Sequence, residues 1–210
     1  EAGFWVGVFR VVAAGGVLSL ADGLRLVRRR GQLMQAAADA QDGCMAAVLG
    51  LPDETVEAAC REAGGIVLPV NYNSPGQLVI AGERSAVEAA SAACKAAGAR
   101  RVMPLAVSGA FHTPMMQAAA AQLLAFVEGL TFQQPKMPIY TNLTGERLSV
   151  KEMPLHLEKH MVSPVRWTTL FNNAIADGFT SGCEIGPGKT LTGFARKINP
   201  EFRAVPVETF

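Results

Sequence analysis

Residues 43–108 read GCMAAVLGLPDETVEAACREAGGIVLPVNYNSPGQLVIAGERSAVEAASAACKAAGARRVMPLAVS, and short apolar runs alternate in them with helix-forming segments. The apolar runs predict strands, and the alanine-rich segments between them predict helices. The expected strands cover residues 45–51, 67–71, 78–81 and 101–107, and the expected helices cover residues 53–63 and 85–97. Gly98 suits the left-handed position that follows a helix. The order β-α-β-β-α-β is that of the ferredoxin-like motif, which we therefore expect over residues 41–108.

The segments on either side of this motif also alternate between helix and strand. The expected helices cover residues 21–37, 114–130, 155–161, 168–177 and 190–197, and the expected strands cover residues 139–142, 183–185 and 204–207. Alternation of this kind predicts an α/β fold with a mostly parallel sheet. Because no linker marks the ends of residues 41–108, we expect residues 1–40 and 109–210 to form one larger domain into which the smaller one is inserted.

Charge and cysteine content exclude several kinds of partner. The chain has 210 residues, of which 19 are basic and 18 acidic, so its net charge of +1 gives no reason to expect nucleic acid or an anionic membrane. The four cysteines lie far apart, without the spacing of a metal site or a disulfide framework. We therefore expect no metal, and reduced thiols in a cytoplasmic protein.

The start of the chain is apolar. Residues 3–20 contain one central charge, Arg10, which would cost about 2.5–3.5 kcal/mol in a bilayer. We expect this segment to be a buried helix preceded by a turn and not a membrane span. The first residue is Glu1, and we expect the chain to be a fragment of a longer one.

One histidine lies where a reactive group is expected. The string VSGAFHTPMM at residues 107–116 ends a predicted strand, turns at Gly109, and places His112 just before a predicted helix. Loops at the carboxyl ends of strands hold the reactive groups of many α/β proteins. A histidine at this position can equally cap the helix or lie in the core, and the spacing leaves both interpretations open.

Five strings, taken together, resemble one family. They are LVRRRGQLMQ at 26–35, VNYNSPGQ at 70–77, SGAFHTPMM at 108–116, SPVRW at 163–167 and EIGPGKTL at 184–191. In this order they resemble motifs of malonyl-CoA:acyl-carrier-protein transacylases and of the acyltransferase domains of fatty-acid and polyketide synthases. The resemblance implies an α/β-hydrolase-like larger subdomain, incomplete here at its N-terminal end, with the ferredoxin-like subdomain inserted.

The resemblance also implies an activity and its partners. In that family a serine takes the malonyl group from malonyl-CoA and passes it to the phosphopantetheine thiol of acyl carrier protein in fatty-acid biosynthesis, without a cofactor. By resemblance, His112 is the general base and acid, and Arg30 binds the malonyl carboxylate, as a guanidinium can do with two hydrogen bonds. Phe111 would leave little room for an α-methyl branch. We expect His112 to lie near Arg30, in an accessible cleft between the two subdomains.

Arg30 has a simpler interpretation beside this one. With Val27, Gly31 and Met34 it falls on one face of the helix expected at residues 21–37, whereas Arg28 and Arg29 point elsewhere. An arginine on an apolar face can extend its charged end into water. Without the resemblance this second interpretation would be preferred.

The sequence departs from the family at the nucleophile. The string Gly3-Phe4-Trp5-Val6-Gly7 stands where the family has Gly-His-Ser-Leu-Gly, so Trp5 occupies the serine position and cannot act as a nucleophile. The backbone N–H of Val6 would be an oxyanion donor. The family's N-terminal loop with its glutamine is not found. His160 stands where the family usually has glutamine, whose backbone carbonyl orients the catalytic histidine.

Two other functions remain as alternatives. The first is a catalytically dead fragment, or a module that binds acyl-CoA or carrier protein without transfer, which would arise from divergence or from a corrupted reading frame. The second is a P-loop nucleotide binder, suggested by Gly188-Lys189-Thr190. The complete P-loop pattern requires glycine at position 183, which is Cys183, so this alternative is remote.

Overall fold

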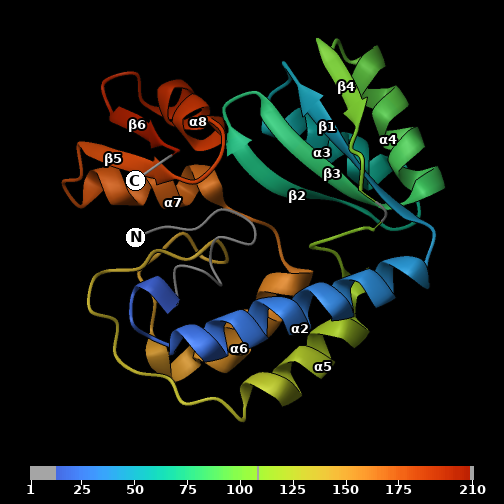
Figure 1. Ribbon diagram of the computed structural model, residues 1–210. Helices are drawn as coiled ribbons and strands as arrows, with labels where there is room; N and C mark the ends of the chain where they lie inside the picture. Colours follow the sequence, from blue (N-terminus) through green and yellow to red (C-terminus); the bar gives the residue numbers. More distant parts are fainter. Residues whose placement is uncertain (1–12, 108, 209–210) are drawn as a thin grey trace.

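The computed structural model describes residues 13–107 and 109–208. Figure 1 shows three groups of elements: a sheet with two helices, a set of long helices below it, and a smaller group of helices and strands beside both.

The first group contains an antiparallel sheet. Its elements are β1 (Gly43–Leu49), α3 (Asp53–Glu62), β2 (Val67–Ser74), β3 (Gln77–Glu83), α4 (Arg84–Ala96) and β4 (Arg101–Pro104). The strand order is β2-β3-β1-β4, and every neighbouring pair is antiparallel. Each element lies where the sequence predicts it, and Gly98 has the left-handed φ of +94°. The last strand is shorter than predicted and ends at Pro104, whose nitrogen has no hydrogen to donate to a ladder.

Both faces of this sheet are apolar. One face packs with α3 and α4 into a core that includes Val48, Val56 and Ile80. The opposite face carries Met45, Val70 and Val79, against which the segment that follows β4 packs. Leu105, Val107 and Phe111 therefore lie against the sheet.

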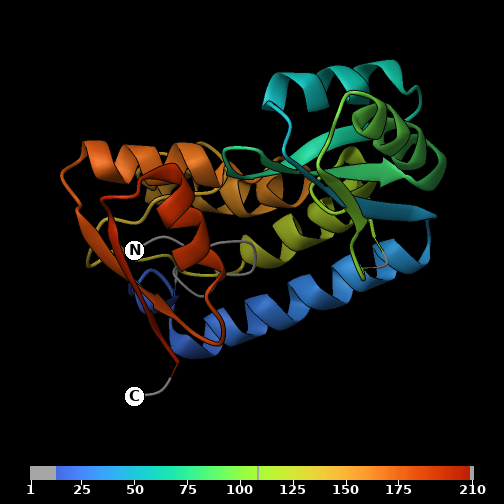
Figure 2. The same cartoon turned by 90° about the horizontal axis from the view of Figure 1, so that it is seen from above.

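The second group consists of helices packed around one apolar core. Its elements are α2 (Leu20–Asp39), η1 (Pro114–Met116), α5 (Gln117–Val127), η2 (Val150–Glu152) and α6 (Met153–Val162). Leu26, Leu123 and Leu157 are buried in that core, one from each long helix. Figures 1 and 2 both show α2 running along this group toward the sheet.

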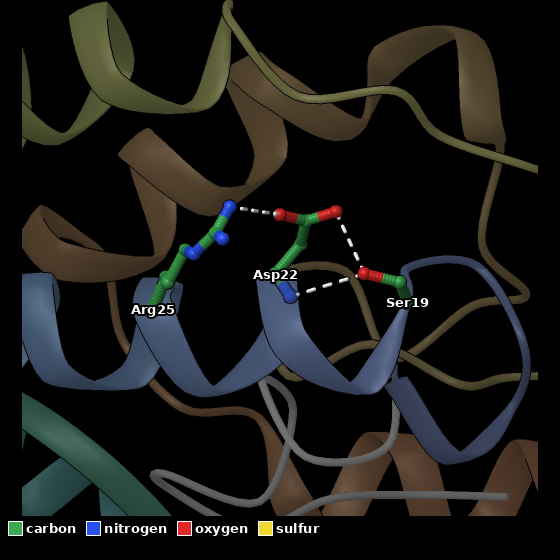
Figure 3. A network of polar contacts seen from close by, with 3 residues as sticks. All are labelled: Ser19, Asp22 and Arg25. Atoms are coloured by element: carbon green, nitrogen blue, oxygen red, sulfur yellow. Dashed lines mark hydrogen bonds and ion pairs between the residues drawn. The ribbon is translucent and has the colours of Figure 1, made fainter.

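The start of α2 is fixed by polar contacts. The Ser19 hydroxyl accepts a hydrogen bond from the Asp22 backbone N–H (3.1 Å) and donates one to the Asp22 carboxylate (2.7 Å). Arg25 binds the other carboxylate oxygen at 3.1 Å, as Figure 3 shows. A capped first turn with an acidic residue is favourable at a helix N-terminus. The helix expected at residues 21–37 is confirmed, and it begins one residue earlier, at Leu20.

The third group contains α7 (Trp167–Ala176), β5 (Ser181–Ile185), α8 (Thr190–Ile198) and β6 (Arg203–Val207). Strands β5 and β6 pair in parallel. In the described ranges they are the only parallel strand pair among the named strands, so the larger parallel sheet expected from the sequence is not found there.

The strand predicted at residues 139–142 is wrong. Tyr140 forms only an isolated bridge with Arg147. The residues between them form a tight turn, in which the Gly145 N–H donates a hydrogen bond to the Thr141 carbonyl (2.8 Å). The segment therefore enters the site described below as a loop.

The apolar start of the chain is described only from residue 13. Residues 13–14 are helical, a turn follows with Gly16 at φ +77°, and Val17 and Leu18 are buried. The turn that the sequence predicts before this helix lies outside the described residues. No helix of the described chain is long and apolar enough to cross a membrane.

Candidate active site

His112 lies in the loop between β4 and η1 with an unusual backbone. Its φ is +64°, and among the described residues it is the only non-glycine residue with a positive φ. Conformations of this kind cost free energy and occur often at functional sites. The Thr113 hydroxyl stabilises the turn by donating to the Ala110 carbonyl (2.7 Å).

One ring nitrogen of His112 is bound and the other is not. Nδ1 lies 2.9 Å from the backbone carbonyl oxygen of His160. Because a carbonyl only accepts, Nδ1 carries the hydrogen of the neutral ring. Nε2 then keeps its lone pair, and it has no hydrogen-bond partner within the described ranges. A general base needs a free lone pair on the nitrogen that accepts the proton, and this tautomer provides that lone pair at Nε2.

The His112 side chain is fully buried. Burial and the nearby Arg30 charge lower its pKa to about 4, although backbone groups of His160 and Ser163 oppose that shift. The expectation that it lies near Arg30 is consistent with this electrostatic effect. The expectation of an accessible cleft is wrong in this structure, because the ring is enclosed by segments distant in sequence, including α6.

Arg30 lies on the buried side of α2. Only 4% of its surface is exposed, and burial lowers its pKa to about 10, so the guanidinium remains charged at neutral pH. The predicted companion Met34 is buried, but Gly31 is exposed, because the stripe is formed by Leu26, Arg30, Leu33 and Met34. Arg28 is exposed as predicted. The interpretation of Arg30 as a side chain extending into water is therefore wrong.

His160 belongs to the same buried group. Its ring lies edge-on to that of His112, with the centroids 5.2 Å apart and the planes at 90°. Burial, His112, Arg30 and His156 together hold the pKa of His160 well below its usual range. His156, one turn earlier on α6, is also buried, and its pKa is lowered to about 4.

The three histidines do not form a metal site. Among the described residues, no group of three histidine, cysteine, aspartate or glutamate side chains is arranged to hold a metal ion. The described part contains all four cysteines, and each is free.

Sequence analysis did not identify Asn142 as part of this site. It is fully buried, and its amide Nδ2 lies 3.4 Å from Nε2 of His160. The spacing of the sequence gives no signal for it, and the strand predicted at residues 139–142 concealed it.

Phe111 packs against both large apolar groups. Its half-buried ring contacts the helical core and also the face of the sheet opposite α3 and α4. It therefore connects the two parts of the molecule next to His112.

The structure brings two of the quoted strings together. Val165 N–H donates to the Val70 carbonyl (2.8 Å), and Tyr72 N–H donates to the Val165 carbonyl (3.0 Å). The adjoining Arg166 N–H donates to the Asn142 carbonyl (2.8 Å). These bonds tie β2 to the loop that carries Asn142.

The P-loop alternative fails at the start of α8. The two Glu184 carboxylate oxygens accept hydrogen bonds from the backbone N–H groups of Leu191 (2.9 Å) and Thr192 (2.8 Å). A phosphate would need such N–H groups, but here a carboxylate of the chain occupies them. Trp5 and Val6, the expected nucleophile and oxyanion positions, lie outside the described residues.

Comparison with known proteins agrees with this combination of fold and site. The acyl transferase domain family matches residues 5–204. The chain is 42% identical over 200 residues to the malonyl CoA-acyl carrier protein transacylase of Escherichia coli K12, and 36% identical over 210 residues to that of Bacillus subtilis. These matches cover 94% and 98% of the chain.

Solved structures give the same result. A malonyl-transacylase in complex with a type II PKS acyl-carrier protein superposes with a TM-score of 0.96 at 40% identity, over 99% of this chain and 69% of that one. An acyl carrier protein S-malonyltransferase from Vibrio cholerae gives 0.95 at 39% identity, over 100% of this chain and 69% of that one. The chain has an α/β fold and belongs to the acyl transferase domain family. It spans 65% of the length of the Escherichia coli relative.

Proposed function

We propose that this chain carries the base and the acid-binding arginine of a transferase that moves malonyl from malonyl-CoA to the phosphopantetheine thiol of an acyl carrier protein. The observation that carries the proposal is a pair of buried residues. They are His112, whose Nδ1 is bound by the His160 carbonyl, and Arg30, whose charge acts on the His112 ring. The relatives bear the names of malonyl transacylases, which supports the choice of acyl group.

The residues divide the chemistry between them. In the transfer to carrier protein, the malonyl group is held as an ester on the serine that the family has and that Trp5 replaces here. Nε2 of His112 takes the thiol proton as the sulfur attacks the ester carbonyl, and it returns that proton to the departing serine oxygen. The Arg30 guanidinium binds the free carboxylate of the malonyl group. Phe111 bounds the acyl pocket, the Val6 N–H stabilises the oxyanion, and no cofactor takes part.

The architecture belongs to the same proposal. Residues 41–108 form a ferredoxin-like subdomain, supported by the strand order β2-β3-β1-β4. Residues 1–40 and 109–210 form an α/β-hydrolase-like subdomain, supported by the parallel pair β5-β6 with α7 and α8. A cytoplasmic location is supported by the four free cysteines.

Trp5 favours a second function, binding without transfer. An indole offers no hydroxyl for an acyl ester, whereas Arg30 and His112 are retained. Under this alternative the chain binds malonyl-CoA and forms no acyl-enzyme.

Labelling with radioactive malonyl-CoA tests whether the chain as it stands forms an acyl-enzyme. We expect the chain as it stands to form no labelled band on a gel and to transfer nothing to acyl carrier protein. Trp5→Ser alone should not restore transfer, because Phe4 and Val6 also differ from the family's turn. A labelled band from the unchanged chain that disappears in His112→Ala would show that another residue is the nucleophile.

Arg30→Ala tests the carboxylate site by calorimetry. Removing the guanidinium leaves the carboxylate unpaired in a buried site, so malonyl-CoA should bind more weakly by about 1–3 kcal/mol. Acetyl-CoA, which lacks that carboxylate, should bind equally well to both proteins. Arg28→Ala is the control, because Arg28 is exposed on the same helix. Equal losses for both ligands would assign Arg30 to the fold alone.

A further inference from the structure

Asn142 is a buried polar residue next to the site, and packing alone does not explain why a polar side chain is there. Its backbone carbonyl accepts from Arg166 N–H at 2.8 Å, and its side chain has no exposed surface. Amide Nδ2 lies 3.4 Å from Nε2 of His160, whereas Oδ1 has no hydrogen-bond partner among the described residues. A buried amide oxygen without a partner costs stability, and an apolar residue of the same size would avoid that cost.

The neighbours of Asn142 lead directly to His112. The His160 ring lies between them, 3.4 Å from the Asn142 amide on one side and edge-on to the His112 ring on the other. The carbonyl of the same His160 accepts the Nδ1 hydrogen of His112. A rotation of the His160 ring would therefore disturb the face against which His112 packs, and it would do so in the same residue whose carbonyl fixes the His112 tautomer.

The titratable groups around His160 make its orientation matter more. The groups that act on it are His112 from the β4–η1 loop, Arg30 from α2 and His156 from α6 itself, and none of these is a carboxylate. An N–H donated by Asn142 to Nε2 requires a lone pair on that atom, so it keeps the His160 ring neutral and its hydrogen on Nδ1.

We propose that Asn142 is a positioning residue which, through the imidazole of His160, holds the His112 ring in the single tautomer that leaves Nε2 free to accept a proton. This inference rests on the proposed function for the role of His112 as base. The backbone carbonyl of His160 supplies the bond to Nδ1, and Asn142 keeps the residue that carries this carbonyl in place.

The three histidines of the chain make a direct test possible. In the full chain labelled with ¹⁵N, the ring nitrogens of only three histidines need to be assigned. At pH 7 the unchanged protein should show His112 as one neutral tautomer with hydrogen on Nδ1. In Asn142→Ala the His112 nitrogens should move toward the averaged shifts of two tautomers. If the alanine variant folds poorly, Asn142→Ser can replace it. The serine hydroxyl is too short to reach Nε2 of His160, so we expect the same change.

A double-mutant cycle shows whether Asn142 acts through His160. His160→Gln keeps the backbone carbonyl but removes the ring, so adding Asn142→Ala to it should produce no further change at His112. His156→Gln, one turn away on the same helix, is the control and should leave the His112 tautomer unchanged. The proposal is overturned if both Asn142 variants fold and leave His112 in one tautomer, or if the effects of Asn142→Ala and His160→Gln simply add.

Malonyl-CoA binding, measured in parallel, keeps this result separate from the proposed function. If the tautomer changes as described but the unchanged chain does not bind malonyl-CoA, the positioning role stands and the proposed substrate is wrong. If binding is found but Asn142→Ala leaves His112 unaffected, the positioning role is wrong and the proposed function stands.

Discussion

The backbone beside His112 can be followed one residue at a time. Gly109 passes so close to its neighbours that a Cβ there would lie 2.8 Å from the Ala38 side chain and 2.8 Å from the Phe111 ring. Phe111 joins the helical core to the sheet, and His112 follows it directly. The absence of a side chain at position 109 therefore helps to place both residues.

Gly109→Ala should lower the free energy of unfolding by about 1–3 kcal/mol, because the added methyl group overpacks a closed site. Urea unfolding measures the change. Gly129→Ala is a suitable control, since its only close contact would be an ordinary 3.5 Å approach to the Phe126 carbonyl. If both variants unfold at the same urea concentration, the tight approach at Gly109 does not constrain the loop.

Among the elements, α2 holds Arg30 in the site. Its first turn is fixed by the Ser19 cap, while Gly31 in its interior is exposed. An added Cβ at Gly31 would meet no atom within 4 Å among the described residues outside the neighbouring turns of the helix. The Ser19 cap before Arg30 therefore stabilises the helix, and Gly31 after Arg30 weakens it.

Two variants of α2 should change stability in opposite directions. Ser19→Ala should lower the free energy of unfolding by about 1 kcal/mol, because the Asp22 N–H loses its partner. Gly31→Ala should raise it by about 0.5–1 kcal/mol, because alanine restricts the unfolded chain and suits a helix interior. Thermal unfolding with circular dichroism measures both. Destabilisation by Gly31→Ala would mean that the exposed side of α2 is covered.

At the scale of the whole molecule, the buried histidines couple folding to pH. His112 and His156 have folded pKa values of about 4, and that of His160 is also well below its usual range. An unfolded histidine binds its proton below about pH 6.5. Between pH 6.5 and 4 the unfolded state therefore holds protons that the folded state does not.

Stability should consequently fall as the pH is lowered through this window, by at most about 1.4 kcal/mol per pH unit for each of His112 and His156, and His160 should act in the same direction. Urea unfolding at a series of pH values measures the slope. In His156→Gln the slope should decrease by the contribution of one histidine, while the site at His112 is left intact. If the slope of stability against pH is the same in the unchanged chain and in His156→Gln, His156 is exposed to solvent in the folded protein.

The sequence by itself determined the local elements and the family to which the chain belongs. The spacing of apolar residues, helix caps and turn residues act over a few neighbouring positions. The sequence could therefore predict α2, the four strands of the antiparallel sheet and the Gly98 turn. The five strings identified the family, which the comparisons establish.

Only the tertiary structure decided how these residues meet. Whether His112 is buried depends on α6, 40 or more residues away, and the contact of Asn142 with His160 depends on a loop that was predicted as a strand. The start of α8 is occupied by the carboxylate of Glu184, which comes from β5. Burial and pairing of this kind arise from packing between distant segments, whose desolvation and hydrogen bonds have no counterpart in local spacing.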